Sequence, residues 1–122
     1  MNTEIKWNAE LFGVEIKTDD AHIVVSAQPS MVMSWHDAVR FYKDNKVWQL
    51  PTREHLQLIA ARLDGVNAII RANGGYEIRS WHWTADEYNE FRAWYVDMYD
   101  GGTGGSYKDG DNYVRAVSAF QN

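Results

Sequence analysis

The period of the apolar residues changes twice along this chain of 122 residues, and their order limits the fold more than any other feature. Residues 12–17 and 22–28 alternate as strands do, around a hairpin turn at 18–21. Helical spacing follows from residue 35 to about residue 72, and from residue 77 the period returns to two. Strands, helices and strands in this order predict an α+β fold, without the alternation that builds a parallel sheet.

Short polar signals mark the ends of the two expected helices. Ser34, with an acidic residue three positions later, resembles a capping box and predicts a helix over about 35–44. Thr52, directly after a proline, predicts the start of a second helix. The Asp-Gly pair at 64–65 should interrupt this helix, and the Asn-Gly-Gly run at 73–75 should end it.

The later strands are expected at 77–84, 93–99 and 113–120. Residues 100–112, reading DGGTGGSYKDGDN, hold five of the nine glycines, so the sequence predicts a loop there. In an antiparallel sheet successive connections alternate between the two ends. The connections at 85–92 and 100–112 therefore need not be neighbours.

Bulk composition excludes several classes of protein. The chain has no cysteine, which excludes disulfides, thiolate metal sites and a cysteine nucleophile. A net charge of −5, scattered along the chain, argues against nucleic acid as a partner. No apolar stretch approaches the roughly 18 residues of a membrane span. The length is typical of a single domain, so we expect one domain over 1–122. The first 20 residues show no signal-peptide pattern, and we therefore expect a protein that is cytoplasmic or released with an assembly.

Several motifs occur in a fixed order over about residues 34–120. They are 34–38 (SWHDA), 48–56 (WQLPTREHL), 80–87 (SWHWTADE), 93–96 (AWYV) and 113–117 (YVRAV). Together they resemble the C-terminal domain of the collagen-like bacterial adhesins. His82 and Ala85 depart from that family's pattern. The resemblance implies a C-type-lectin-like fold, an antiparallel sheet with two helices, and a habit of binding glycans or other surfaces through loops.

Most of these motifs look like framework. Arg115 lies within an otherwise apolar strand, so it needs a carboxylate or carbonyl partner. Six Trp and seven Tyr exceed what a core of this size requires. Most of these rings should be core, and the rest are available to a binding face.

No catalytic constellation is recognisable, so we expect a protein that is not an enzyme. There is no Gly-x-Ser-x-Gly elbow, and the adjacent acids at 19–20 and 86–87 should point apart or into solvent. Formylglycine-generating enzymes share the implied fold, but they depend on cysteine. No two of the four histidines have the spacing of a metal motif.

Calcium is the one cofactor with a candidate site. The oxygen-rich run at 109–112, with Asp97 or Asp100, could bind it. The same run is ordinary turn chemistry, which is the favoured interpretation, so we expect neither a metal nor another cofactor.

The remaining hypothesis is a binding surface formed by loops 85–92 and 100–112. Its candidate residues are Tyr88, Asn89, Arg92, Tyr107, Lys108, Asp109 and Asp111. The tyrosines could stack on a sugar while the polar groups bind hydroxyls; the alternative is two solvated loops. We therefore expect a module that binds a carbohydrate or a protein surface. The rival is a structural or display subunit of a larger assembly, such as a phage-like tail or fibre, which would be an oligomer.

Overall fold

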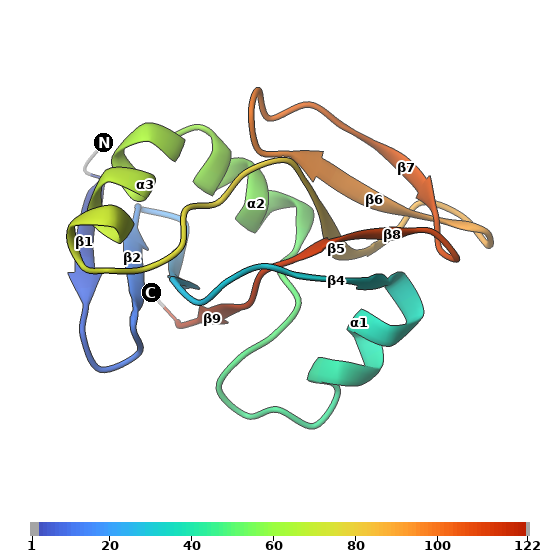
Figure 1. The fold of residues 1–122 in the computed structure, drawn as a ribbon, viewed down its shortest axis with the longest axis horizontal. Helices are drawn as coiled ribbons and strands as arrows, with labels where there is room; N and C mark the ends of the chain where they lie inside the picture. Colours follow the sequence, from blue (N-terminus) through green and yellow to red (C-terminus); the bar gives the residue numbers. More distant parts are fainter. Residues whose placement is uncertain (1–2, 122) are drawn as a thin grey trace.

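The computed structural model describes residues 3–121, and over this range the chain forms two β-sheets and three α-helices (Figure 1). The strand order is β1-β2-β3-β9 in the first sheet and β4-β8-β5-β6-β7 in the second. Most of the strand pairs are antiparallel. The α+β prediction is confirmed, whereas the prediction of one sheet with two helices is wrong.

The first sheet contains the predicted hairpin. Its strands are β1 (Glu4–Asn8), β2 (Gly13–Lys17), β3 (His22–Ser26) and β9 (Val117–Ala119). Thr18 stabilises the β2–β3 turn, because its Oγ1 accepts hydrogen bonds from the backbone N–H groups of Asp20 and Ala21. Strand β1 was not predicted. It forms by pairing with β2 along its whole length.

The helices are α1 (Trp35–Tyr42), α2 (Arg53–Ala60) and α3 (Leu63–Ala72). The predicted caps are confirmed at Ser34 and Thr52, whose hydroxyls accept N–H groups of the first helical turn. The expected second helix is in fact two helices. The chain leaves helical geometry at Arg62 (φ −127°, ψ 22°), so the break precedes the Asp-Gly pair at 64–65, which lies in the first turn of α3.

The second sheet consists of β4 (Met31–Ser34), β5 (Trp81–Glu87), β6 (Arg92–Asp97), β7 (Thr103–Tyr107) and β8 (Asp111–Val114). The loop prediction for 100–112 is wrong, because β7 and the start of β8 lie within it. The strand expected at 113–120 is divided at Arg115 and Ala116, which belong to neither sheet. Val114 therefore belongs to the second sheet and Val117 to the first.

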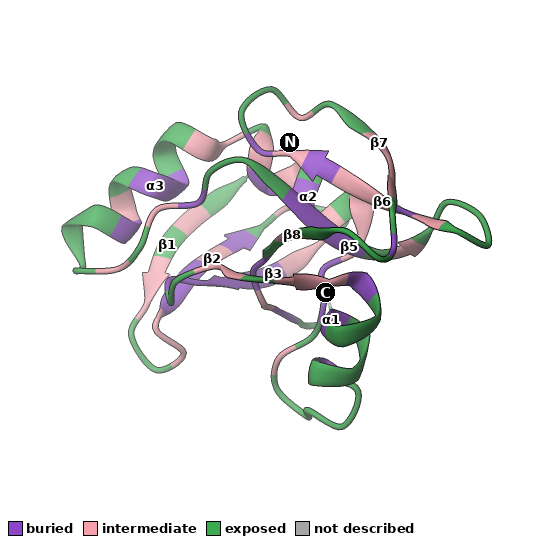
Figure 2. Ribbon diagram, turned by 45° about the vertical axis from the view of Figure 1, so that its right-hand side comes forward, coloured by how far each residue is buried: buried purple, intermediate pink, exposed green. Residues whose placement is uncertain are grey.

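Two apolar clusters hold these layers together. One joins the first sheet to α2 and α3 and also includes Val96 of β6, and the other joins the second sheet to α1. Buried residues line the facing sides of the elements, while the outer sides of α1 and α3 are exposed (Figure 2). Over the described residues no helix has the length and apolar character to cross a membrane. The clusters make the second sheet a rigid support for its turns.

Candidate functional site

The β5–β6 turn is organised by one side chain. Asn89 Oδ1 accepts the backbone N–H groups of Phe91 and Arg92, at 2.9 and 2.8 Å. The backbone N–H groups of Tyr88 and Asn89 both donate to the carbonyl of Arg92. This is an Asx-type turn, in which a short side chain replaces a backbone partner. The turn fixes the backbone that carries Tyr88 and Phe91, whose side chains are exposed.

Strand β7 is covered by aromatic rings from β6 and from the β5–β6 turn. A Cβ atom on Gly105 would lie 2.7 Å from Cγ of Tyr88, and one on Gly104 would lie 3.0 Å from the hydroxyl of Tyr95. Only glycine leaves room for these rings. The rings in turn replace the packing that glycine cannot give to an edge strand.

Because β7 is a strand, the chain returns to the end of the sheet where the β5–β6 turn lies (Figure 1). The N–H of Lys108 donates to the carbonyl of Phe91 at 2.9 Å and joins the two turns. We call residues 88–92 and 107–109 the tip surface. The segments 85–92 and 107–109 are therefore neighbours. The alternation of connections between the two ends of a sheet did not by itself predict this, because it did not include β7.

Lys108 braces the tip surface from inside. Its ammonium donates to Glu87 Oε2 at 2.7 Å and to the carbonyl of Glu90 at 2.9 Å, and it lies 4.8 Å from the ring centre of Trp35. The residue is only 5 % exposed. Lys108 therefore links both turns to α1. Almost none of its surface is left to contact a ligand.

Rings and guanidinium groups alternate on one side of β6 and β7. The Arg92 guanidinium lies over the Tyr107 ring at 4.4 Å and donates to its hydroxyl at 2.9 Å. Arg53 lies over Trp94 at 4.3 Å, and Trp94 meets Tyr88 edge to face at 4.6 Å. These cation–π and aromatic contacts fix the orientation of the rings. Tyr88 and Tyr107 remain 47 % and 61 % exposed.

Beside this row of rings is a depression of about 310 Å³. It lies between the start of α1 and the two turns. Its lining residues are His36, Glu90, Phe91, Tyr107, Lys108 and Asp109. The volume is at the lower end of the range for small-ligand sites. The depression combines an exposed aromatic wall with carboxylate acceptors.

The structure gathers most of the predicted site residues but not all of them. Asn89, Arg92, Tyr107, Lys108 and Asp109 lie in or beside the two joined turns, and Tyr88 packs on the same side of β7 as Arg92. Asp111 lies apart from this group. It lines a separate trough of about 400 Å³ with exposed Trp81 and Tyr113.

Sequence reasoning missed five residues of the site. They are His36, Arg53, Glu90, Phe91 and Trp94. Phe91 and Glu90 belong to a loop that the sequence had already singled out. Trp94 lies in the motif at 93–96, one of those that look like framework, and it is half-buried. Nothing local to Arg53 or His36 could have indicated the site, because both come from helices distant in sequence.

The carboxylates proposed for calcium lie in two different turns. Asp97 and Asp100 are in and beside the β6–β7 turn, where each accepts a backbone N–H group, from Tyr99 and Gly102. The run at 109–112 lies beyond the other end of β7. Within residues 3–121, no three His, Asp or Glu side chains gather as a metal-binding group.

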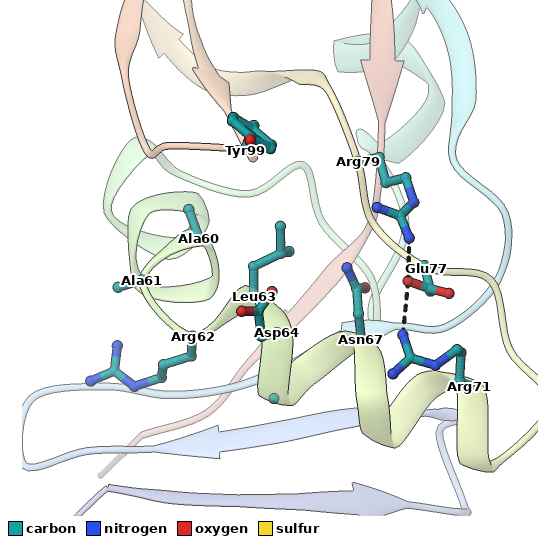
Figure 3. Close-up of a pocket in the computed structure, with 11 residues that line it drawn as sticks. Ala60, Ala61, Arg62, Leu63, Asp64, Asn67, Arg71, Glu77, Arg79 and Tyr99 are labelled. Carbon is teal, nitrogen blue, oxygen red and sulfur yellow. Dashed lines mark hydrogen bonds and ion pairs between the residues drawn. The ribbon is translucent and has the colours of Figure 1, made fainter.

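A larger concavity than the depression at the tip surface lies elsewhere, along α3 (Figure 3). It has a volume of about 890 Å³ and is bounded by α3, the segment before β5 and the β6–β7 turn. Two arginines and one glutamate form an ion-pair cluster at one end of it. This cleft is separate from the tip surface and shares no residue with it.

Comparisons with known proteins add no relative. No protein-family model matches the chain, and no curated protein matches it. The resemblance to the adhesin domain therefore stays a prediction from the ordered motifs.

Proposed function

We propose that this chain is a C-type-lectin-like binding domain, not an enzyme, and that its tip surface binds a carbohydrate. The ordered motifs support the fold assignment, together with an α+β architecture of two mostly antiparallel sheets. One observation carries the binding proposal. Two turns distant in sequence are joined by the Lys108–Phe91 hydrogen bond, and they present exposed tyrosines beside a polar depression.

The chemistry of the tip surface suits a sugar. A sugar ring has an apolar C–H face, which packs on an aromatic ring, and an edge of hydroxyls, which need donors and acceptors. Tyr107 provides the ring, and Arg92 holds it in place by stacking. Glu90 and Asp109 provide acceptors, and His36 adds a further polar group. Because the rings are held before a ligand arrives, binding costs little side-chain entropy.

The test is a glycan array probed with the wild type and with Tyr107→Ala. We expect Tyr107→Ala to lower affinity for the bound glycan by about tenfold or more, the size of effect typical of a central aromatic contact. Tyr107→Phe keeps the ring and loses only the hydroxyl, so it should retain most of the binding. Affinities are then measured by titration calorimetry on the glycans that the array selects.

Tyr76→Ala is the matched control, because Tyr76 is 56 % exposed and lies outside the tip surface. This variant should bind as the wild type does. If Tyr107→Ala leaves binding unchanged, or if Tyr76→Ala weakens it equally, the tip surface is not the binding site. Binding of proteins but of no glycan in a parallel pull-down would also reject the carbohydrate.

A further inference from the structure

The cleft along α3 has two chemically different ends (Figure 3). Ala60, Leu63 and Tyr99 lie together at the end that we call apolar, where the carboxylate of Asp64 lies beside Leu63. Arg71, from the last turn of α3, and Arg79, from the segment before β5, reach toward Glu77 at the charged end. The volume of about 890 Å³ is within the range of small-molecule sites.

The charged end carries an excess of positive charge in a protein whose net charge is −5. Arg71 Nη1 and Arg79 Nη2 both approach the same oxygen of Glu77, Oε1, at 3.1 and 2.6 Å. The side chain of Glu77 is 21 % exposed, whereas those of Arg71 and Arg79 are 58 % and 71 % exposed. Two guanidiniums and one carboxylate leave one net positive charge. This charge faces an open cleft.

Glu77 sets the geometry of this end. A guanidinium has five N–H donors, and a single carboxylate oxygen cannot satisfy two guanidiniums. By holding both groups around one oxygen, Glu77 places them as a ligand oxyanion would require. Arg62 also lines the cleft, but its guanidinium points away and donates to the carbonyl of Leu58. The two arginines at Glu77 are therefore the groups that can recognise an anion.

The apolar end is formed by a ring that is almost fully in solvent. Tyr99 is 88 % exposed, the highest value among the large apolar and aromatic side chains of the described residues. Its backbone is nevertheless fixed, because its N–H donates to Asp97 Oδ1 at 3.0 Å and the same turn is closed by the Gly101 N–H on the carbonyl of Asp97. An exposed tyrosine on this hydrogen-bonded turn, opposite Leu63, can cover the apolar body of a ligand.

We propose that this cleft binds a small organic carboxylate with an aromatic or aliphatic body. The carboxylate lies between Arg71 and Arg79, and the body lies against Tyr99 and Leu63. A monoanion fits better than a dianion for two reasons. The charged end has one net positive charge, and the carboxylate of Asp64 also lines the cleft. This site is independent of the tip surface, so either proposal can fail without the other.

The probe is 2-naphthoate, compared with its neutral analogue 2-naphthamide in amide-proton NMR titrations of the full chain. We expect 2-naphthoate to shift signals within residues 60–79 and 97–101 and to leave the tip surface unchanged. The amide should bind at least about fivefold more weakly, because it lacks the charge that two arginines recognise. Equal binding of the two compounds, absence of shifts, or shifts spread over other surfaces would overturn the proposal.

Variants of the exposed charged groups sharpen this test. Arg79→Gln and Arg71→Gln should each lower the affinity for 2-naphthoate by about tenfold, the effect of losing one charge-assisted hydrogen bond. Glu77→Gln should raise it, because the amide keeps an Oε1 acceptor between the two guanidiniums and removes the negative charge that competes with the ligand. Arg40→Gln is the matched control, since Arg40 is equally exposed but lies on α1 and pairs with Asp37. Thermal unfolding confirms that each variant is folded.

Two outcomes would contradict this account of the charged end. If Glu77→Gln weakened 2-naphthoate binding as much as Arg79→Gln, the glutamate would not compete with the ligand. If 2-naphthyl phosphate bound more tightly than 2-naphthoate, the site would prefer dianions, and the assignment to carboxylates would be wrong.

Discussion

Arg115 is a charged residue that the fold buries against neutral partners. It is 2 % exposed, and its guanidinium donates to the carbonyls of Ser26, Tyr76 and Glu77 at 2.7–2.9 Å. Among the described residues no carboxylate forms an ion pair with it, and burial lowers its pKa to about 10. The sequence predicted a carboxylate or carbonyl partner, and carbonyls are found. These bonds tie the end of β3 to the segment before β5 at the junction of the two sheets.

A short chain of hydrogen bonds continues from Arg115 to a buried histidine. Arg115 Nε donates to Ser30 Oγ at 2.9 Å, and Ser30 Oγ lies 2.8 Å from His82 Nε2. His82 Nδ1 lies 3.2 Å from the carbonyl of Ser80, which can only accept, so Nδ1 carries the proton. Ser30 therefore donates to Nε2. A neutral imidazole therefore accepts a hydrogen bond from Ser30 and donates one to the carbonyl of Ser80. A protonated imidazole would direct a second N–H group at the Ser30 hydroxyl, which already accepts from Arg115.

This arrangement predicts a pH dependence of stability. Burial lowers the pKa of His82 to about 4, so below the ordinary histidine pKa of about 6.5 the unfolded chain binds a proton that the folded chain excludes. The wild type should lose up to about 3 kcal/mol of its free energy of unfolding from this group as the pH falls from about 6.5 to about 4.

His82→Gln is the comparison, measured by urea unfolding across that pH range. The other titratable groups are the same in both proteins, so their contributions cancel in the difference between the two curves. The wild type should be the more stable protein near neutral pH, and its advantage should shrink as the pH falls. Parallel curves would show that His82 does not titrate as its environment requires.

At the scale of elements, strand β7 depends on side chains from elsewhere in the second sheet. Gly105→Ala would place a methyl group 2.7 Å from Cγ of Tyr88, so the ring must move. We expect a loss of about 1–3 kcal/mol in the free energy of unfolding, the usual cost of overpacking. In the background of Tyr88→Ala the same substitution should cost much less. Equal costs in both backgrounds, measured by chemical denaturation, would contradict this packing.

The elements that could be predicted from the sequence are those specified locally. The caps at Ser34 and Thr52 join a side chain to its own helix, and the β2–β3 hairpin has its turn residues between two alternating strands. Strand β7 could not be predicted, because its two glycines indicate a loop unless the rings of Tyr88 and Tyr95 are already placed. The sequence therefore indicated most residues of the tip surface but not the strand that brings its two turns together.

On the scale of the whole molecule, the tip surface and the α3 cleft lie at different ends (Figure 1). The tip surface belongs to the second sheet and α1, whereas the cleft lies above α3, which packs on the first sheet. Arg115 connects the two halves at the chain segment where one sheet gives way to the other. The first cluster also contains Val96 of β6 and so reaches the second sheet, but the two surfaces share no lining residue, and ligands at the two sites would not collide.

The most direct test of the central claim is an amide-proton NMR titration with the glycan that binds best on the array. The account predicts shifts concentrated at residues 88–94 and 107–109, with both turns responding together at the same ligand concentrations. Shifts in only one turn, or shifts centred on the trough between Trp81 and Tyr113, would contradict a single binding surface built from the two joined turns.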